Sequence, residues 1–346
     1  MNSRSVRSRA PLRLGFGGGG TDVSPYCDEF GGLVLNAAIN RFCHVTIEPR
    51  QDGLLLLHSA DMGNRWEGAA PEFLGPESGA PTLMRGVYNR IVKDYRDGEP
   101  MALSITSYAD APAGSGLGTS SSMVIALLAA FSELLSLPLG PYDLARLAYE
   151  IERVDLGLSG GRQDQYAAAF GGFNYMEFYA GEHTLVNQLR LRRRTVLELE
   201  SSLVIYFTGV SRESARIIEQ QKDSVKSHGG QRFEAMHRLK DGAIRMKEAL
   251  LLGRISELAR LLDESWQHKK QTSDKISTGH IDEIYEAAIK AGALGGKVSG
   301  AGGGGFMMFL VDPVCREAFI RVLSGYNGKA ELCNFWPEGA ESWTIG

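Results

Sequence analysis

A glycine-rich turn that runs into hydroxyl side chains is the segment of this chain with the clearest chemistry. Residues 112–122 read Pro-Ala-Gly-Ser-Gly-Leu-Gly-Thr-Ser-Ser-Ser and are followed by an apolar run over 123–131. The glycines let the backbone approach an anion, and a helix beginning near residue 119 offers unpaired N–H groups and its positive dipole end. The pattern predicts a phosphate site, although a loop with an ordinary helix cap has the same composition. The residues expected at the phosphates are Pro112, Gly114, Ser115, Gly116, Leu117, Gly118, Thr119, Ser120 and Ser121.

Other glycine-rich patterns in the chain fail to match their full consensus. The pair Gly296-Lys297 lacks both the first glycine and the hydroxyl residue of a P-loop. Residues 15–20 meet the dinucleotide-binding spacing, but Thr-Asp-Val-Ser-Pro follows where a helix should begin. The His-Arg-Asp and Asp-Phe-Gly segments of protein kinases do not occur in the sequence. An oxidoreductase that binds NAD through residues 15–20 stays open as an alternative, and it predicts NADH binding.

Length and charge limit the classes of partner. A chain of 346 residues suits two lobes of roughly 150 to 200 residues each, with a ligand cleft between them. The formal net charge of −4 gives no long-range attraction to nucleic acid or to an anionic membrane, so we expect small-molecule partners. The four cysteines form no Cys-x-x-Cys pair, which argues against a disulfide framework and a zinc site. Since no apolar run could span a bilayer, we expect a cytoplasmic protein.

The hydrophobic patterns predict strands and helices in both halves, which is the α+β class. Strands are expected over 6–16, 33–39, 42–49, 53–59, 103–108, 173–178 and 203–207, and strand-containing segments over 298–310, 331–335 and 341–345. Helices are expected over 82–95, 119–135, 141–155, 163–170, 211–227, 232–251, 255–272 and 280–291. The segment 181–200 is the expected crossing between lobes, which predicts domains 1–190 and 191–346. Its basic run, 192–194, predicts a solvated strand face.

Four segments resemble, in order, the motifs of the GHMP small-molecule kinases, named after galactokinase, homoserine kinase, mevalonate kinase and phosphomevalonate kinase. The segments are 10–13 with 21–22, 112–122, 160–172 and 297–304. The resemblance implies a two-lobed fold with an N-terminal lobe of the ribosomal-protein-S5-domain-2-like type and a ferredoxin-like C-terminal lobe. It places the active site in the cleft between the lobes and implies ATP-dependent phosphoryl transfer with Mg²⁺.

The resemblance also implies roles for single residues. Asp164 matches the catalytic aspartate of the family, which would accept or orient the proton of the acceptor hydroxyl, and Arg13 would neutralise Asp164 and the transferring phosphoryl group. Ser120 and Glu152 match the metal-binding hydroxyl and its acidic partner, a donor set that suits Mg²⁺. From spacing alone, Asp164 could equally cap a helix and Glu152 could pair with Arg153.

Three segments would bind the acceptor. Asp22 matches an acid that binds sugar hydroxyls in galactokinase-like members. Galactokinases carry Glu-His before this Thr-Asp pair, whereas Gly19-Gly20 stands here, which predicts space or backbone donors for a larger phosphorylated sugar. The expected set is Gly18, Gly19, Gly20, Thr21, Asp22, Gly161, Arg162, Gly300, Gly302 and Gly303.

Residues 12–22 and 160–174 most resemble the family members that phosphorylate the anomeric C1 hydroxyl of D-glycero-D-manno-heptose 7-phosphate to the 1,7-bisphosphate, in nucleotide-activated heptose synthesis. The implied partners are ATP and a sugar phosphate, without nucleic acid or membrane. The sequence leaves open a homodimer, another sugar 1-kinase of the fucokinase-like kind, and a sensor that binds without turnover. It also leaves open which basic residue holds the distal phosphate, with Arg162 and Arg85 as candidates.

Overall fold

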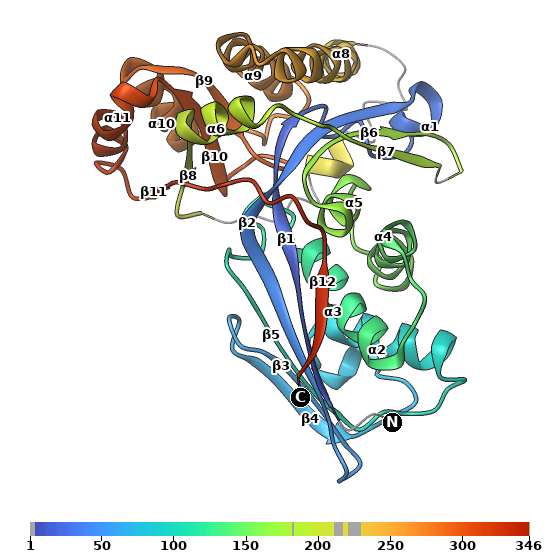
Figure 1. Ribbon diagram of the computed structural model, residues 1–346. Coiled ribbons are helices and arrows are strands. Elements are labelled where there is room, and N and C mark those ends of the chain that lie inside the picture. Colours follow the sequence, from blue (N-terminus) through green and yellow to red (C-terminus); the bar gives the residue numbers. More distant parts are fainter. Residues whose placement is uncertain (1–3, 182, 211–216, 221–229, 346) are drawn as a thin grey trace.

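Two β-sheets with flanking helices make up the molecule. The computed structural model describes residues 4–181, 183–210, 217–220 and 230–345 (Figure 1). Within these residues the strands form one eight-stranded and one four-stranded sheet. The α+β class predicted from the sequence is confirmed.

The larger sheet is built around two long antiparallel strands, β1 and β2. Its order is β12-β1-β2-β5-β3-β4, with β6 on β2 and β7 on β6, and only β3 and β5 pair in parallel. The separate strands predicted over 33–39 and 42–49 are one strand, because residues 40–41 are absorbed by a register shift opposite Pro11 and Leu12. The strands are β1 (Ser5–Gly17), β2 (Gly32–Pro49), β3 (Leu54–Ser59), β4 (Asn64–Ala69), β5 (Leu103–Ala109), β6 (Phe173–Phe178), β7 (Thr184–Gln188) and β12 (Glu341–Ile345).

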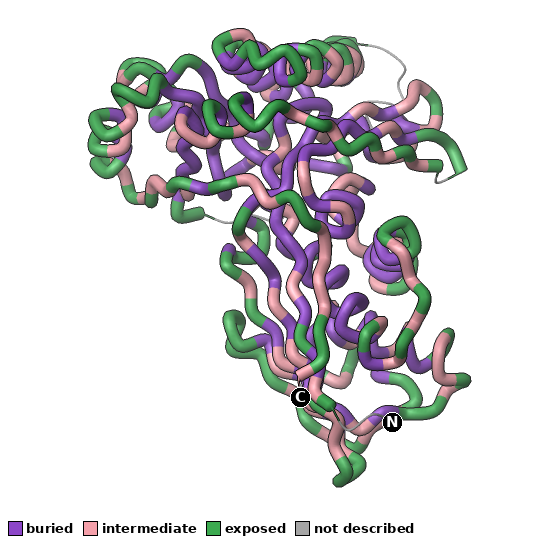
Figure 2. Tube along the Cα trace, in the orientation of Figure 1, coloured by how far each residue is buried: buried purple, intermediate pink, exposed green. Residues whose placement is uncertain are grey.

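Helices cover one face of this sheet, and the central one, α3, is buried nearly all round (Figures 1 and 2). Its apolar sequence from Met123 to Phe131 packs between the sheet and its neighbouring helices. The helix predicted over 141–155 changes to a π-helix after Glu150. The elements are α1 (Tyr26–Phe30), η1 (Pro76–Ser78), α2 (Thr82–Tyr95), α3 (Thr119–Leu135), α4 (Pro141–Glu150), the π-helix η2 (Ile151–Asp155) and α5 (Gln163–Phe170).

The smaller sheet, in the order β11-β8-β10-β9, has its own core around Trp266, Phe309 and Phe319. The predicted segment 298–310 is the end of one strand, a glycine loop and a second strand. The basic run 192–194 lies at the start of helix α6, so its prediction as a strand face was wrong. The elements are α6 (Arg193–Ser202), β8 (Leu203–Phe207), α8 (Gln231–Leu252), α9 (Ile255–Lys270), α10 (Gly279–Lys290), β9 (Ala293–Val298), β10 (Phe306–Val311), η3 (Pro313–Cys315), α11 (Arg316–Leu323) and β11 (Lys329–Glu331).

The C-terminal segment runs back to the larger sheet, where β12 pairs with β1 (Figure 1). Of the strand predicted over 331–335, Glu331 ends β11 and Phe335 forms a single bridge with Ile39. The helix predicted over 211–227 lies outside the described residues except at 217–220, which are helical. The predicted domain boundary near residue 190 stays a prediction.

Candidate active site

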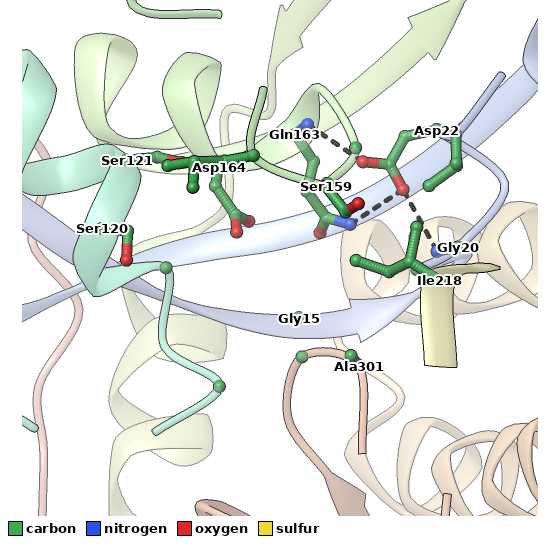
Figure 3. A pocket seen from close by; sticks show the side chains of 18 of the residues that line it. Gly15, Gly20, Asp22, Ser120, Ser121, Ser159, Gln163, Asp164, Ile218 and Ala301 are labelled. Carbon is green, nitrogen blue, oxygen red and sulfur yellow. Dashed lines mark hydrogen bonds between the residues drawn. The ribbon is translucent and has the colours of Figure 1, made fainter. Parts of the chain in front are cut away.

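A cleft of about 680 Å³ lies where β1, α3 and α5 meet the loop that follows β9 (Figure 3). Most of its walls come from 13–23, 113–121 and 152–164, and the other half of the chain adds Ile218, Lys269, Lys297, Gly300 and Ala301. The glycine-rich turn before α3 and the glycine-rich loop after β9 therefore border the same cleft.

The glycine turn before α3 is held open to this cleft by its backbone conformation. Gly114, Gly116 and Gly118 have φ angles of 73°, 80° and 79°, which residues with a side chain rarely adopt. A Cβ atom on Gly116 would lie 2.5 Å from the carbonyl oxygen of Ser299, so only glycine lets the two loops touch. Gly118 is the N-cap of α3, and none of the described side chains caps the helix. Its first-turn N–H groups are therefore left for an anion.

Most of the residues predicted at the phosphates line the cleft. Those that do are Gly114, Gly116, Gly118, Thr119, Ser120 and Ser121. Pro112, Ser115 and Leu117 do not: Ser115 and Leu117 are fully buried, and their carbonyl groups accept hydrogen bonds from the backbone of Phe306 and Arg13, at 2.9 Å and 3.0 Å. These two residues hold the turn in place.

Asp164 and Arg13 form an ion pair, and both residues line the cleft. Arg13, on β1, is 4% exposed, and its Nε and Nη2 atoms lie 2.8 Å and 2.7 Å from Oδ1 of Asp164. Asp164 stands in the first turn of α5, and its side chain is 26% exposed. Its Oδ2 atom has no donor among the described residues, so one oxygen carries the guanidinium and the other is open to a ligand.

Glu152 lies in the π-helix η2 and is buried, yet it lines the same cleft as Ser120. Its Oε2 atom accepts a hydrogen bond of 2.5 Å from Gln165, and Nη1 of Arg153 lies 3.7 Å from Oε1. Burial raises the pKa of Glu152, and the charge of Arg153 and the hydrogen bonds from Gln165 and Ser121 oppose that rise.

The oxygen atoms of Ser120 and Glu152 fit Mg²⁺, which binds few protein ligands and completes its shell with water and substrate phosphates. Among the residues that the structure describes, no group of three or more His, Cys, Asp or Glu side chains could hold a metal ion alone. A metal here would therefore share its ligands with a phosphate.

Asp22 is fully engaged by the protein itself. Its Oδ2 atom accepts the backbone N–H groups of Arg162 and Gln163, at 2.9 Å and 3.1 Å. Its Oδ1 atom accepts the N–H of Gly20 at 3.1 Å and the side-chain amide of Gln163 at 3.0 Å (Figure 3). A Cβ atom on Gly161 would lie 2.0 Å from Oδ2, so this approach requires glycine. A carboxylate has about four lone-pair sites, and all four of these have donors.

The other residues predicted to bind the acceptor divide into two sets. Gly19, Gly20, Gly161 and Gly300 line the cleft, as Asp22 does, whereas Gly18, Thr21, Arg162, Gly302 and Gly303 do not. The guanidinium of Arg162 is buried and bonds to the carbonyl of Tyr179 at 2.8 Å and to Asp28 at 3.1 Å. Arg85, on α2, does not line the cleft either.

Sequence reasoning missed Lys269, which lines the cleft, and gave no individual role to Lys297 and Gln163, which lie within the motif segments 297–304 and 160–172 and line it too. Lys269 follows the apolar stripe of α9, three residues after the buried Trp266. A charge at an apolar-face position of an amphipathic helix is the signal that identifies it. Lys297 donates a hydrogen bond of 3.0 Å to the carbonyl of Phe16, so it joins β9 to β1.

In the described part of the chain, no helix has the length and apolar character needed to cross a bilayer.

Comparisons with known proteins support one family. The model of the GHMP kinases N terminal domain matches residues 82–172, and that of the GHMP kinases C terminal region matches 246–327. A D-glycero-alpha-D-manno-heptose 7-phosphate kinase of Campylobacter jejuni is 46% identical over 99% of this chain and 100% of its own length. The crystal structure of a D-glycero-D-manno-heptose 1-phosphate kinase from Bacteriodes thetaiotaomicron has a TM-score of 0.83 and 48% identity, covering 99% of each chain. An L-fucokinase/L-fucose-1-P guanylyltransferase of Bacteroides fragilis is 28% identical over 92% of this chain, which spans 35% of that protein.

Proposed function

This chain belongs to the GHMP kinase family, and from that premise we propose that it transfers the terminal phosphoryl group of ATP to the C1 hydroxyl of D-glycero-D-manno-heptose 7-phosphate. The substrate rests on the full-length relative that is a heptose 7-phosphate kinase. The observation that carries the reaction is the free Oδ2 atom of Asp164, which opens into the same cleft as the uncapped start of α3.

The turn and first helical residues over 113–121 form the nucleotide end of the cleft. Their backbone N–H groups would hold the phosphates of ATP, and Ser120 and Glu152 would hold Mg²⁺. When bound, ATP supplies the phosphoryl group and Mg²⁺ neutralises charge on the phosphate oxygens. Since burial raises the pKa of Glu152, a cation beside this carboxylate offsets the cost of keeping it charged.

Asp164 accepts the proton of the acceptor hydroxyl on Oδ2, while Arg13 keeps Oδ1 fixed and faces the charge of the transferring group. The loose transition state of phosphoryl transfer needs little proton removal before transfer, so fixing the hydroxyl is the larger part of this role. Asp22 acts beside it by capping α5 and by holding the side-chain amide of Gln163. Both residues belong to the acceptor end of the cleft, which we define as Gly19, Gly20, Asp22, Gln163, Gly300 and Ala301.

We place the protein in the cytoplasm, where ATP is supplied. All four cysteines are free thiols, and three of them are buried, which suits a reducing compartment.

The test is an ADP-release assay of the purified protein with ATP and Mg²⁺ across a set of acceptors. Heptose 7-phosphate should give a kcat/KM at least about a hundredfold above that of mannose or fucose. Those sugars carry no phosphate, so the protein groups that bind the phosphate would stay buried without a partner. Heptose 1-phosphate is also tested, because one relative is named a heptose 7-phosphate kinase and the other a heptose 1-phosphate kinase. A preference for fucose would reject the proposal in favour of a fucokinase-like enzyme.

A further inference from the structure

Lys269 is a buried cation that the reaction described above does not use. It lies in the last turn of α9, is 2% exposed, and lines the cleft from the second half of the chain. Its neighbour Lys270 is partly exposed, with its Nζ atom 3.7 Å from Asp282. The two adjacent lysines therefore have different environments, one in the cleft and one at the surface.

The ammonium group of Lys269 has few partners within the protein. Its Nζ atom donates one hydrogen bond of 2.5 Å to the carbonyl of Gly300. Among the described residues no carboxylate lies within 4.0 Å of it, so it takes part in no ion pair. An ammonium has three N–H donors, and two of these are left for a ligand. A buried, unpaired charge is costly, which makes an anionic ligand favourable here.

The position of Lys269 assigns it to the acceptor end of the cleft. A Cβ atom built on Gly19 would lie 3.6 Å from its Nζ atom and 3.7 Å from the side-chain amide of Gln163. Gln163 is held in turn by Asp22. The ammonium group of Lys269 thus lies beside residues proposed to bind the sugar. It does not belong to the segment 113–121, which forms the nucleotide end.

The other cations of the cleft have partners of their own. Arg13 holds Asp164, and Arg153 lies beside Glu152 and the carbonyl groups of the loop after η2. Lys297 bonds to β1, and burial followed by the charges of Lys269 and Arg13 keeps its pKa well below the usual range. Burial and the charge of Arg13 lower the pKa of Lys269 only to about 8, so it is mostly charged at neutral pH.

We propose that Lys269 binds the phosphate group of the acceptor sugar and thereby selects a phosphorylated substrate. This inference rests on the proposed function, because it requires an acceptor that carries a phosphate. A sugar without that group leaves the ammonium buried and unpaired, so the same residue that binds one substrate disfavours the other. Neither Arg162 nor Arg85 supplies this contact, since neither lines the cleft.

The test replaces Lys269 by Met, which keeps the length of the side chain and removes its charge, and uses Lys270→Met as the matched control. With heptose 7-phosphate, Lys269→Met should raise KM roughly 10- to 100-fold, the range for loss of a hydrogen bond between charged groups. The KM for ATP should stay within about twofold, and kcat/KM for unphosphorylated heptose should not fall. Lys270→Met should match the wild type.

A measurement without turnover separates binding from catalysis. Heptose 7-phosphate alone should raise the melting temperature of the wild type and of Lys270→Met, and much less that of Lys269→Met. Without ligand, Lys269→Met should be at least as stable as the wild type, because an unpaired buried charge is gone. Lys269→Arg keeps the charge and should retain a preference for the phosphorylated acceptor.

Two results would overturn the inference. An equal loss of kcat/KM with the phosphorylated and unphosphorylated sugars would mean that Lys269 serves the transferring phosphoryl group. A lower melting temperature with an unchanged acceptor preference would mean a structural role. Failure of the proposed function is a different result: the wild type itself would then not turn over heptose 7-phosphate.

Discussion

Asp22 and Asp164 both lie at the N-terminal end of α5, and they differ in what each leaves for a substrate. Asp22, in the loop between β1 and α1, accepts four hydrogen bonds from the protein and is 2% exposed. Asp164, in the first turn of α5, gives one oxygen to Arg13 and leaves the other open. Both are aspartates in one cleft, yet only one has unused acceptor capacity.

This difference in free acceptor sites gives Asp22 a positioning role and Asp164 a direct role in the reaction. A carboxylate whose acceptor sites are filled fixes the backbone that donates to it, and here that backbone is the first turn of the helix that carries Asp164. A carboxylate with a free oxygen can accept a proton or a hydroxyl group. Asp22 therefore acts on the substrate through α5 and Gln163, and Asp164 acts directly.

Removing the charge of Asp164 should have the largest effect. Asp164→Asn keeps an oxygen for Arg13 but loses the carboxylate oxygen that fixes the acceptor hydroxyl and takes its proton. The kcat should therefore fall by roughly 10³-fold, or about 4 kcal/mol of transition-state stabilisation. ATP binding should persist within a few fold. Steady-state kinetics and nucleotide titration measure these quantities, with Asp155→Asn as control because Asp155 pairs with Arg90 instead. A kcat near that of the wild type would contradict the direct role.

Asp22→Asn should act mainly on stability. The amide NH₂ group would face two N–H donors, so the free energy of unfolding should fall by about 2 to 4 kcal/mol and kcat by roughly tenfold as α5 shifts. Urea unfolding measures the first effect. Asp28→Asn is the matched control, because Asp28 contacts the side chain of Arg162 rather than the helix backbone. Unchanged stability with a raised KM for the sugar would instead favour direct binding of sugar hydroxyls.

Much of the fold follows from local patterns. The helices over 82–95, 119–135 and 163–170 have the predicted bounds, because apolar periodicity and glycine or proline residues mark their ends. The continuity of β2 could not be predicted, since the bulge at 40–41 depends on its pairing with β1. Helix α6 was missed because the Leu-Arg alternation over 189–192, directly before the helix, is typical of a strand.

The site likewise has one part that could be predicted from local sequence and one part that could not. The nucleotide end is one contiguous segment, so its glycines and hydroxyls could be read together. The acceptor end joins residues far apart in the chain, and Lys269 reaches Gly19 only through tertiary packing of α9. The satisfied state of Asp22 is also invisible in the sequence, because its donors at 162–163 lie 140 residues away.

Glu152 extends the comparison to a third carboxylate, which is buried like Asp22 but has fewer donors. Glu152→Gln should raise the Mg²⁺ concentration for half-maximal activity by roughly 10- to 100-fold, since a neutral amide is a weaker ligand than a carboxylate. Because burial raises the pKa of Glu152, its contribution to stability is lost as pH rises above the usual value of 4.5. At pH 7 without Mg²⁺, Glu152→Gln should thus be at least as stable as the wild type.

The matched control is Glu150→Gln, because the carboxylate of Glu150 pairs with Arg90 of α2, and Glu150 does not line the cleft. An unchanged Mg²⁺ requirement in Glu152→Gln would assign the metal to other ligands.

The smallest expected effect is on the titration of Lys269, because Asp22 and Asp164 both influence the charge of its ammonium group. Burial and Arg13 lower the pKa of Lys269 to about 8, and Asp22 and then Asp164 oppose that shift. A lowered lysine pKa destabilises the fold below pH 8, and this cost is relieved as pH rises toward 10.4. The stability advantage of Lys269→Met over the wild type should therefore shrink by about 1 kcal/mol between pH 7 and 9. The pKa of Lys297, in the same cleft, is also lowered, so the difference between the two proteins is the quantity to measure by urea unfolding.

The same pH dependence can be measured in the Asp22→Asn and Asp164→Asn backgrounds, which compares the effect of each aspartate on the pKa of Lys269. Loss of either negative charge should move the transition to lower pH, and the shift should be larger for Asp22, which opposes the lowered pKa more strongly. A larger shift in Asp164→Asn would place the ammonium nearer the reacting oxygen than the acceptor end. A stability difference that does not depend on pH would mean that Lys269 carries no buried charge, and the acceptor phosphate would then need another partner.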